Sequence, residues 1–129
     1  MNENRKRPIL LLADDDPELI GILVKRLQDL ECDILTASDG QSALDTIRSE
    51  RPDAVVLDVM MPGMNGWEVC KAIKSDEALA DTPVMMLTGI GESLNEITSP
   101  LYGADEHVDK PFNFSELLFK IRRMLASRD

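Results

Sequence analysis

The sequence alternates between short apolar runs and longer segments with helical periodicity, and this alternation restricts the possible folds more than any other feature. Three runs, residues 9–13, 54–57 and 84–87, contain no polar side chain and are bounded by Pro, Asp or Thr. Such runs are typical of strands that are buried on both faces of a sheet. Two weaker segments, residues 34–37 and 107–108, are more polar, so we expect them at the sheet edges.

Four of the segments between these runs have amphipathic helical patterns that begin with recognisable capping residues. Asp16 precedes Pro17, a combination typical of a helix start, and we interpret Asp16 as a cap rather than as a metal ligand. Asp39 and Asn65 stand before the second and third patterns. Asn113, with a glutamate three residues later, resembles a capping box and indicates the start of the last helix.

The remaining interval, residues 93–101, is polar and contains Pro100, so we expect a short or kinked helix that ends near Gly103. Strands that alternate with helices predict an α/β fold, a (βα)₅ unit with a five-stranded parallel sheet, right-handed crossovers and helices on both faces. With the polar strands at the edges, the doubly wound sheet has the flavodoxin-like order 2-1-3-4-5. Ligands then bind beyond the carboxyl ends of strands 1 and 3.

Length, charge and cysteine content limit the class of protein. The 129 residues fit one domain, and acidic residues outnumber basic ones by 24 to 14, for a net charge of −10. This charge disfavours direct contact with nucleic acid or an anionic membrane. No apolar run approaches the roughly 18 residues of a membrane helix, and Cys32 and Cys70 lack metal-ligand spacing.

From these limits we predict a cytoplasmic protein whose thiols are reduced. We expect a flexible basic tail over residues 1–7, one folded domain over residues 8–127 and no output domain in this chain. The sequence leaves open whether the domain stands alone or belongs to a longer protein.

Polar side chains follow four of the predicted strands at their carboxyl ends. Asp14 and Asp15 follow the first strand, Asp58 the third, Thr88 the fourth and Lys110 the fifth. Two carboxylates about 4 Å apart repel by about 4 kcal/mol at an effective dielectric of about 20, so the cluster needs protons or cations. Oxygen ligands in an open site suit Mg²⁺, which together with Lys110 would balance the three negative charges.

The same residues fit phosphoryl transfer. The Asp58 carboxylate would act as nucleophile and form an acyl phosphate. Mg²⁺ and the Lys110 ammonium would neutralise charge on the transferring group, and the Thr88 hydroxyl could donate a hydrogen bond to one of its oxygens. Each residue alone has an ordinary structural interpretation, but their joint position at four strand ends favours a site.

With these residues in place, the sequence resembles the receiver domain of bacterial two-component response regulators, a CheY-like family. The motifs that carry the resemblance are residues 9–16 (ILLLADDD), 56–66 (VLDVMMPGMNG), 87–89 (LTG) and 110–112 (KPF), and the similarity spans essentially the whole chain. It implies that Asp58 is the phosphoacceptor and a metal ligand. It also implies that Asp15 binds Mg²⁺ directly, Asp14 binds it through water, and the Met60 carbonyl is a further ligand.

The resemblance also implies a conformational switch. Lys110 would contact the phosphoryl group, and the bond between Lys110 and Pro111 would be cis. Thr88 would move towards the phosphoryl oxygens, and His107 would rotate into the space that Thr88 leaves. The family commonly carries Tyr or Phe at this last position, and a histidine that faces water on an edge strand is the alternative for its resting state.

The partners are implied in the same way. The phosphoryl donor would be a histidine kinase or a histidine phosphotransfer protein. The output would be a protein target that binds the surface of the fourth helix, fifth strand and fifth helix.

Other functions fit the sequence less well. A Mg²⁺-dependent phosphohydrolase with an aspartyl-phosphate intermediate commonly has a second Asp two residues after the nucleophile, where this chain has Met60. A pseudo-receiver that only binds partners is an alternative, although every phosphorylation residue is present. A nucleotide-binding module would need a glycine-rich fingerprint or a phosphate-binding loop, and the sequence has neither. We therefore predict a signalling switch that is not an enzyme and catalyses only its own phosphorylation and dephosphorylation.

Overall fold

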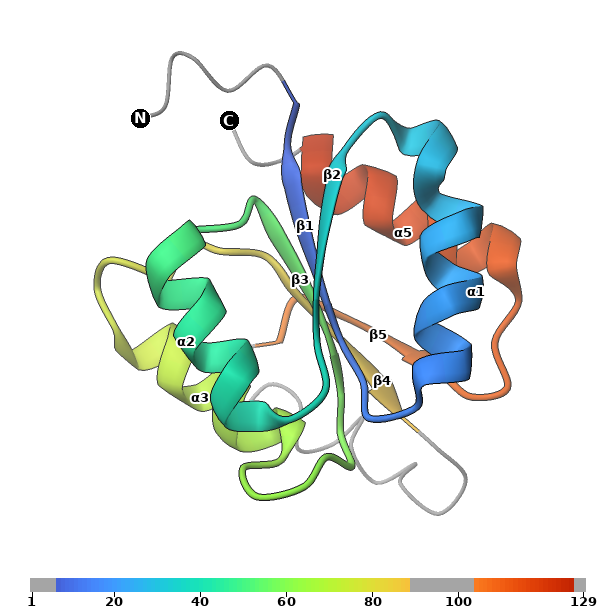
Figure 1. The fold of residues 1–129 in the computed structure, drawn as a ribbon. Coiled ribbons are helices and arrows are strands. Elements are labelled where there is room, and N and C mark those ends of the chain that lie inside the picture. Colours follow the sequence, from blue (N-terminus) through green and yellow to red (C-terminus); the bar gives the residue numbers. More distant parts are fainter. Residues whose placement is uncertain (1–6, 89–103, 127–129) are drawn as a thin grey trace.

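A parallel sheet with helices on both faces organises the chain, which a computed structural model describes over residues 7–88 and 104–126 (Figure 1). The strands are β1 (Ile9–Ala13), β2 (Asp33–Ala37), β3 (Ala54–Asp58), β4 (Val84–Thr88) and β5 (Glu106–Asp109). Their order in the sheet is β2-β1-β3-β4-β5, and all four neighbouring pairs are parallel. The predicted order is confirmed, with the two more polar strands at the edges.

The described helices lie in two layers. They are α1 (Pro17–Leu27), α2 (Gly40–Glu50), α3 (Gly66–Ser75) and α5 (Phe114–Ala126), with a short 3₁₀ helix, Gln28–Leu30, after α1. Figure 1 shows α2 and α3 on one side of the sheet and α1 and α5 on the other. None of the helices in the described ranges has the length and apolarity that a membrane crossing requires.

Side chains alternate along the central strands between two cores. Leu11 and Val55 pack in the core that faces α2 and α3, whereas Leu10 and Val56 pack in the core that faces α1 and α5. All four are fully or almost fully buried. Because successive strand residues point to opposite faces, a wholly apolar strand supplies both cores at once. Complete burial of each leucine contributes about 1.5–3 kcal/mol relative to exposure.

Four side-chain caps fix where the helices begin. Asp16, Asp39, Asn65 and Asn113 each accept hydrogen bonds from backbone N–H groups at the starts of α1, α2, α3 and α5. Glu68 completes a capping box with Asn65. These caps confirm the predicted helix starts. They also hold the loops that follow β1 and β3, where the predicted site residues lie.

Some predictions fall wholly or partly outside the described residues. The expected short helix at 93–101 lies outside them, and so does the expected tail apart from Arg7. Arg7 donates a hydrogen bond of 2.9 Å to the carbonyl of Cys32, just before β2. Cys32 and Cys70 are both buried free thiols, and burial raises the pKa of Cys70 to about 11. That the thiols are reduced stays a prediction.

Candidate functional site

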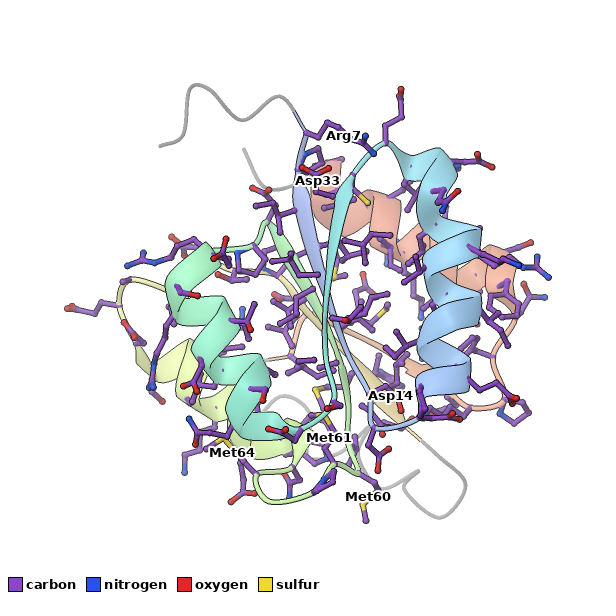
Figure 2. All side chains as sticks on the ribbon, in the orientation of Figure 1. Arg7, Asp14, Asp33, Met60, Met61 and Met64 are labelled. Atoms are coloured by element: carbon purple, nitrogen blue, oxygen red, sulfur yellow. The ribbon has the colours of Figure 1, made fainter. Side chains whose placement is uncertain are left out.

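Three aspartates meet at the carboxyl ends of β1 and β3. Carboxylate oxygens of Asp14, Asp15 and Asp58 all lie within 4.8 Å of one another. Asp14 is 3% exposed and Asp58 4% exposed, while Asp15 faces solvent. In Figure 2, Asp14 and Met60 lie at this end of the sheet, and Arg7 lies at the opposite end. The structure thus brings together the acidic cluster that the sequence predicts.

Backbone contacts fix the two buried aspartates. The Asp14 N–H donates to the carbonyl of Ala37 at 3.0 Å, and its Oδ1 accepts from the Asp16 N–H at 3.0 Å. Asp58 is the last residue of β3, and its backbone lies against Gly66, the first residue of α3. A Cβ on Gly66 would lie 2.3 Å from the Asp58 carbonyl oxygen, so only glycine permits this approach. The local chain therefore fixes the backbone of both aspartates and, through the Asp16 N–H, the carboxylate of Asp14.

Lys110 bridges the two buried carboxylates. Its Nζ lies 3.0 Å from Oδ1 of Asp58 and 3.2 Å from Oδ2 of Asp14. The lysine comes from the end of β5, and the bond between Lys110 and Pro111 is cis, as the resemblance implies. Two strands apart in the sheet, β3 and β5 thus contribute opposite charges to the same pocket.

The electrostatics of the pocket leave an excess of negative charge. Burial raises the pKa of Asp58 from 3.8 to about 6, opposed by the hydrogen bond from Lys110 and reinforced by the charge of Asp14. Burial acts to lower the pKa of Lys110, but its hydrogen bonds and the charges of Asp58 and Asp14 outweigh that effect and raise it. The pocket holds three carboxylates against one ammonium. The remaining two negative charges match one divalent cation.

Thr88 lies at the end of β4 but does not point its proton towards Asp58. Thr88 is 1% exposed, and its hydroxyl donates a short hydrogen bond to Oδ1 of Asp109. The backbone N–H of Lys110 donates to the Thr88 carbonyl at 2.5 Å. Asp109 was not singled out from the sequence. The signal that could have found it is the parallel register, because Thr88 and Asp109 are the last residues of neighbouring strands.

Two other predicted residues come from the loop after β3 and from β5. Met60 follows Asp58 by two residues, and its side chain is 65% exposed at the site end of the sheet (Figure 2). His107 is half-buried in β5, in register with Met86, and its carbonyl accepts a hydrogen bond from Lys120 Nζ at 2.9 Å. Metal ligation by the Met60 carbonyl and rotation of His107 stay predictions.

A groove opens beside the acidic pair. It has a volume of about 500 Å³ and lies between the start of α1 and the loop that joins β2 to α2. Asp14 and Asp15 form part of its wall, together with Ser38 and Ser42. The site is therefore accessible from solvent on this side, although Asp14 and Asp58 themselves are buried.

The sequence matches a known family over most of its length. A family model described as response regulator receiver domain matches residues 10–122. The chain is 41% identical over 129 residues to a probable transcriptional regulator ycf27 from Galdieria sulphuraria, covering 100% of this chain and 49% of that protein. It is 38% identical over 129 residues to the DNA-binding response regulator MtrA from Mycolicibacterium smegmatis, covering 100% and 54%. The chain spans about half the length of these relatives.

Solved structures agree with the sequence comparison. The structure of the chemotaxis response regulator CheY4 from Vibrio cholerae matches with a TM-score of 0.84 and 32% identity. The match covers 93% of this chain and 100% of that chain. The fold of this chain is therefore also found in a solved structure.

Proposed function

The chain belongs to the response regulator receiver domain family, and from this premise we propose that it is a phosphoacceptor switch whose phosphorylated residue is Asp58. The observation that carries the proposal is the environment of that carboxylate. Asp58 is buried at the end of β3, lies 3.0 Å from an ammonium and belongs to a cluster of three carboxylates. A clustered acid with a raised pKa in such a pocket is typical of a reactive group.

The donor set of the pocket fits Mg²⁺. Carboxylate oxygens are hard ligands, and the two uncompensated negative charges favour a divalent ion. Asp15, Asp58 and the carbonyl of Met60 would hold the ion directly, and Asp14 would hold it through water. When bound, Mg²⁺ supplies positive charge close to the phosphoryl oxygens.

The Asp58 carboxylate carries out the covalent step. With a pKa of about 6 it is largely ionised at neutral pH, so an oxygen lone pair is available. That oxygen attacks the phosphorus of a phosphohistidine on the partner, an O–P bond forms, and the P–N bond breaks with its electron pair retained by the imidazole. The product is an acyl phosphate on Asp58 and a free histidine on the partner.

Lys110 and Thr88 serve the phosphoryl group rather than the nucleophile. Lys110 Nζ already lies 3.0 Å from the Asp58 oxygen, so it can follow the charge onto the phosphoryl oxygens. The Thr88 hydroxyl, at the end of the neighbouring strand β4, donates to another oxygen after it leaves Asp109. This change of partner, with rotation of His107, would shift the population between two conformers.

The signal then passes to a partner protein. We expect the donor to be a histidine kinase or a histidine phosphotransfer protein. We expect the target to bind the surface of β5, α5 and the predicted helix that lies outside the described residues. The relatives that carry a DNA-binding name are about twice as long as this chain. That this chain itself makes no direct contact with nucleic acid stays a prediction.

Stoichiometry tests the proposal against a phosphohydrolase. The protein is incubated with acetyl phosphate, with Mg²⁺ or with EDTA, and the bound and released phosphate are both counted. A switch reaches at most one acid-stable but hydroxylamine-labile phosphoryl group per chain and needs Mg²⁺. Rapid release of many equivalents of phosphate per chain would support the phosphohydrolase instead. No labelling under any condition would support a pseudo-receiver.

A further inference from the structure

We propose that Asp109 is a positioning residue that holds the Thr88 hydroxyl away from Asp58 in the unphosphorylated protein and thereby opposes the switch. This inference rests on the proposed function, because it concerns the step in which Thr88 donates to a phosphoryl group on Asp58. It goes further by naming a residue outside the pocket as the competitor for the Thr88 proton.

The pairing of β4 with β5 places the two residues side by side. Thr88 and Asp109 are register partners and the last residues of their strands. The Thr88 hydroxyl donates to Oδ1 of Asp109. Its second acceptor is the carbonyl of Val108 at 3.5 Å, which also belongs to β5. Both contacts therefore direct the hydroxyl towards the edge strand and away from the phosphorylation site.

A threonine hydroxyl has one proton to donate, so the bond to Asp109 and a bond to a phosphoryl oxygen exclude each other. Thr88 is almost fully buried, which limits the water that could replace either partner. Asp109 offers a charged acceptor, and hydrogen bonds to charged groups are the stronger ones. The movement of Thr88 is thus an exchange between two anionic acceptors, the Asp109 carboxylate and the phosphoryl group on Asp58.

The end of β5 contacts both halves of the switch. Asp109 accepts from the side chain of Thr88, and the next residue, Lys110, binds Asp58 with its ammonium at 3.0 Å. The Lys110 N–H also donates to the Thr88 carbonyl at 2.5 Å. If this end of β5 shifts on phosphorylation, two contacts would transmit the shift to Thr88. Loss of the Asp109 contact removes one of them and leaves the lysine in place.

Affinity for a phosphoryl mimic tests the inference directly. Calorimetry on the whole chain measures binding of beryllofluoride in the presence of Mg²⁺. Asp109→Ala frees the Thr88 hydroxyl, so we expect beryllofluoride to bind about tenfold more tightly. This gain is at the low end for the loss of a hydrogen bond to a charged group, because Asp109 is exposed and water weakens the bond. Asp109→Asn is the matched control, because it loses the charge but keeps an acceptor oxygen, so its gain should be smaller. Equal gains in the two variants would mean that charge alone acts, and would overturn the proposal.

A Thr88→Val background separates positioning from a general effect on the strand ends. Valine keeps the shape of threonine and lacks the hydroxyl, so adding Asp109→Ala should then change the affinity by less than about twofold. An equal gain in this background, or no gain in the parent, would show that Asp109 does not act through Thr88. Urea unfolding of each variant confirms that it is folded. If the parent itself does not bind beryllofluoride, the proposed function is overturned and this inference with it.

Discussion

Two ion pairs lie at opposite ends of the same sheet and differ in almost everything except their charges. Arg7 Nε lies 3.6 Å from Asp33 Oδ1, and the two side chains are 52% and 59% exposed. Lys110 Nζ lies 3.0 Å from Asp58 Oδ1, and those side chains are 29% and 6% exposed. Figure 2 labels Arg7 and Asp33 at one end and Asp14 at the other.

The difference shows what burial does to an ion pair. Water screens the Arg7–Asp33 pair, and such exposed pairs contribute about 0–1 kcal/mol. At the other end, the pocket buries two carboxylates around one ammonium, and the pKa of Asp58 rises to about 6 because it is desolvated. The charges are not balanced there, so the pocket gains from a cation.

Removal of the two cations should have very different consequences. Lys110→Met takes away the ammonium that lies 3.0 Å from Asp58 and that we propose to contact the phosphoryl oxygens, so we expect the rate of phosphorylation by acetyl phosphate to fall by about 100-fold. Arg7→Met, the matched control at the other end, should leave this rate unchanged. Time courses of labelling by intact mass measure both. Similar losses in the two variants would contradict the contrast.

Two glycines test whether the site end is held by close backbone contact. A methyl group on Gly66 would lie 2.3 Å from the Asp58 carbonyl oxygen, so Gly66→Ala should lower the free energy of unfolding by about 2 kcal/mol and slow phosphorylation. A methyl group on Gly21, in α1, would have no atom within 4 Å outside its own helix. Gly21→Ala should stabilise the protein by about 1 kcal/mol. Urea unfolding checks both, and a neutral Gly66→Ala would refute the close contact.

The raised pKa of Asp58 gives a pH dependence whose sign is fixed. Between its usual pKa of 3.8 and its folded value of about 6, the folded protein retains a proton that the unfolded chain has lost. This residue therefore makes the free energy of unfolding decrease as pH rises through that window. With screening at the open side of the pocket, Asp58→Asn should be more stable than the parent by about 1–2 kcal/mol at pH 7.

Urea unfolding without Mg²⁺ measures this difference. The gap between Asp58→Asn and the parent should shrink as the pH falls towards about 5, because the parent carboxyl then becomes neutral. Mg²⁺ at pH 7 should stabilise the parent more than the variant. A gap that does not depend on pH would mean that Asp58 titrates normally.

The exposed pair should give the smallest effect. Asp33→Asn removes one partner of Arg7, and we expect the free energy of unfolding to change by less than about 0.5 kcal/mol, with any change disappearing in high salt. Denaturant unfolding at two salt concentrations measures it. A loss of unfolding free energy as large as that of Gly66→Ala would show that the exposed Arg7–Asp33 pair contributes much more to stability than we expect.

The sequence predicted the fold and the members of the acidic cluster because both follow from local patterns. Buried parallel strands need continuous apolar runs, and strand ends in a parallel sheet meet at one edge. Asp14, Asp15, Asp58 and Lys110 were therefore found by counting from those runs. The same patterns give the helix caps, since capping depends on neighbours in the chain.

The partner of the Thr88 hydroxyl could not be found in this way. It depends on the register between β4 and β5 and on one side-chain rotamer, and neither follows from hydrophobic periodicity. The difference in burial between Asp14 and Asp15, adjacent in sequence, likewise depends on which face of the loop each carboxylate occupies. Sequence patterns thus predicted which residues lie at the site, but not that the Thr88 hydroxyl donates to Asp109.

Intact-mass analysis after treatment with acetyl phosphate and Mg²⁺, on the parent chain and on Asp58→Asn, measures whether Asp58 is the residue that accepts the phosphoryl group. Asparagine has nearly the shape of aspartate but no nucleophilic carboxylate oxygen. We expect one added phosphoryl group on the parent and none on the variant. Equal labelling of both chains would contradict the assignment of Asp58 as the phosphoacceptor.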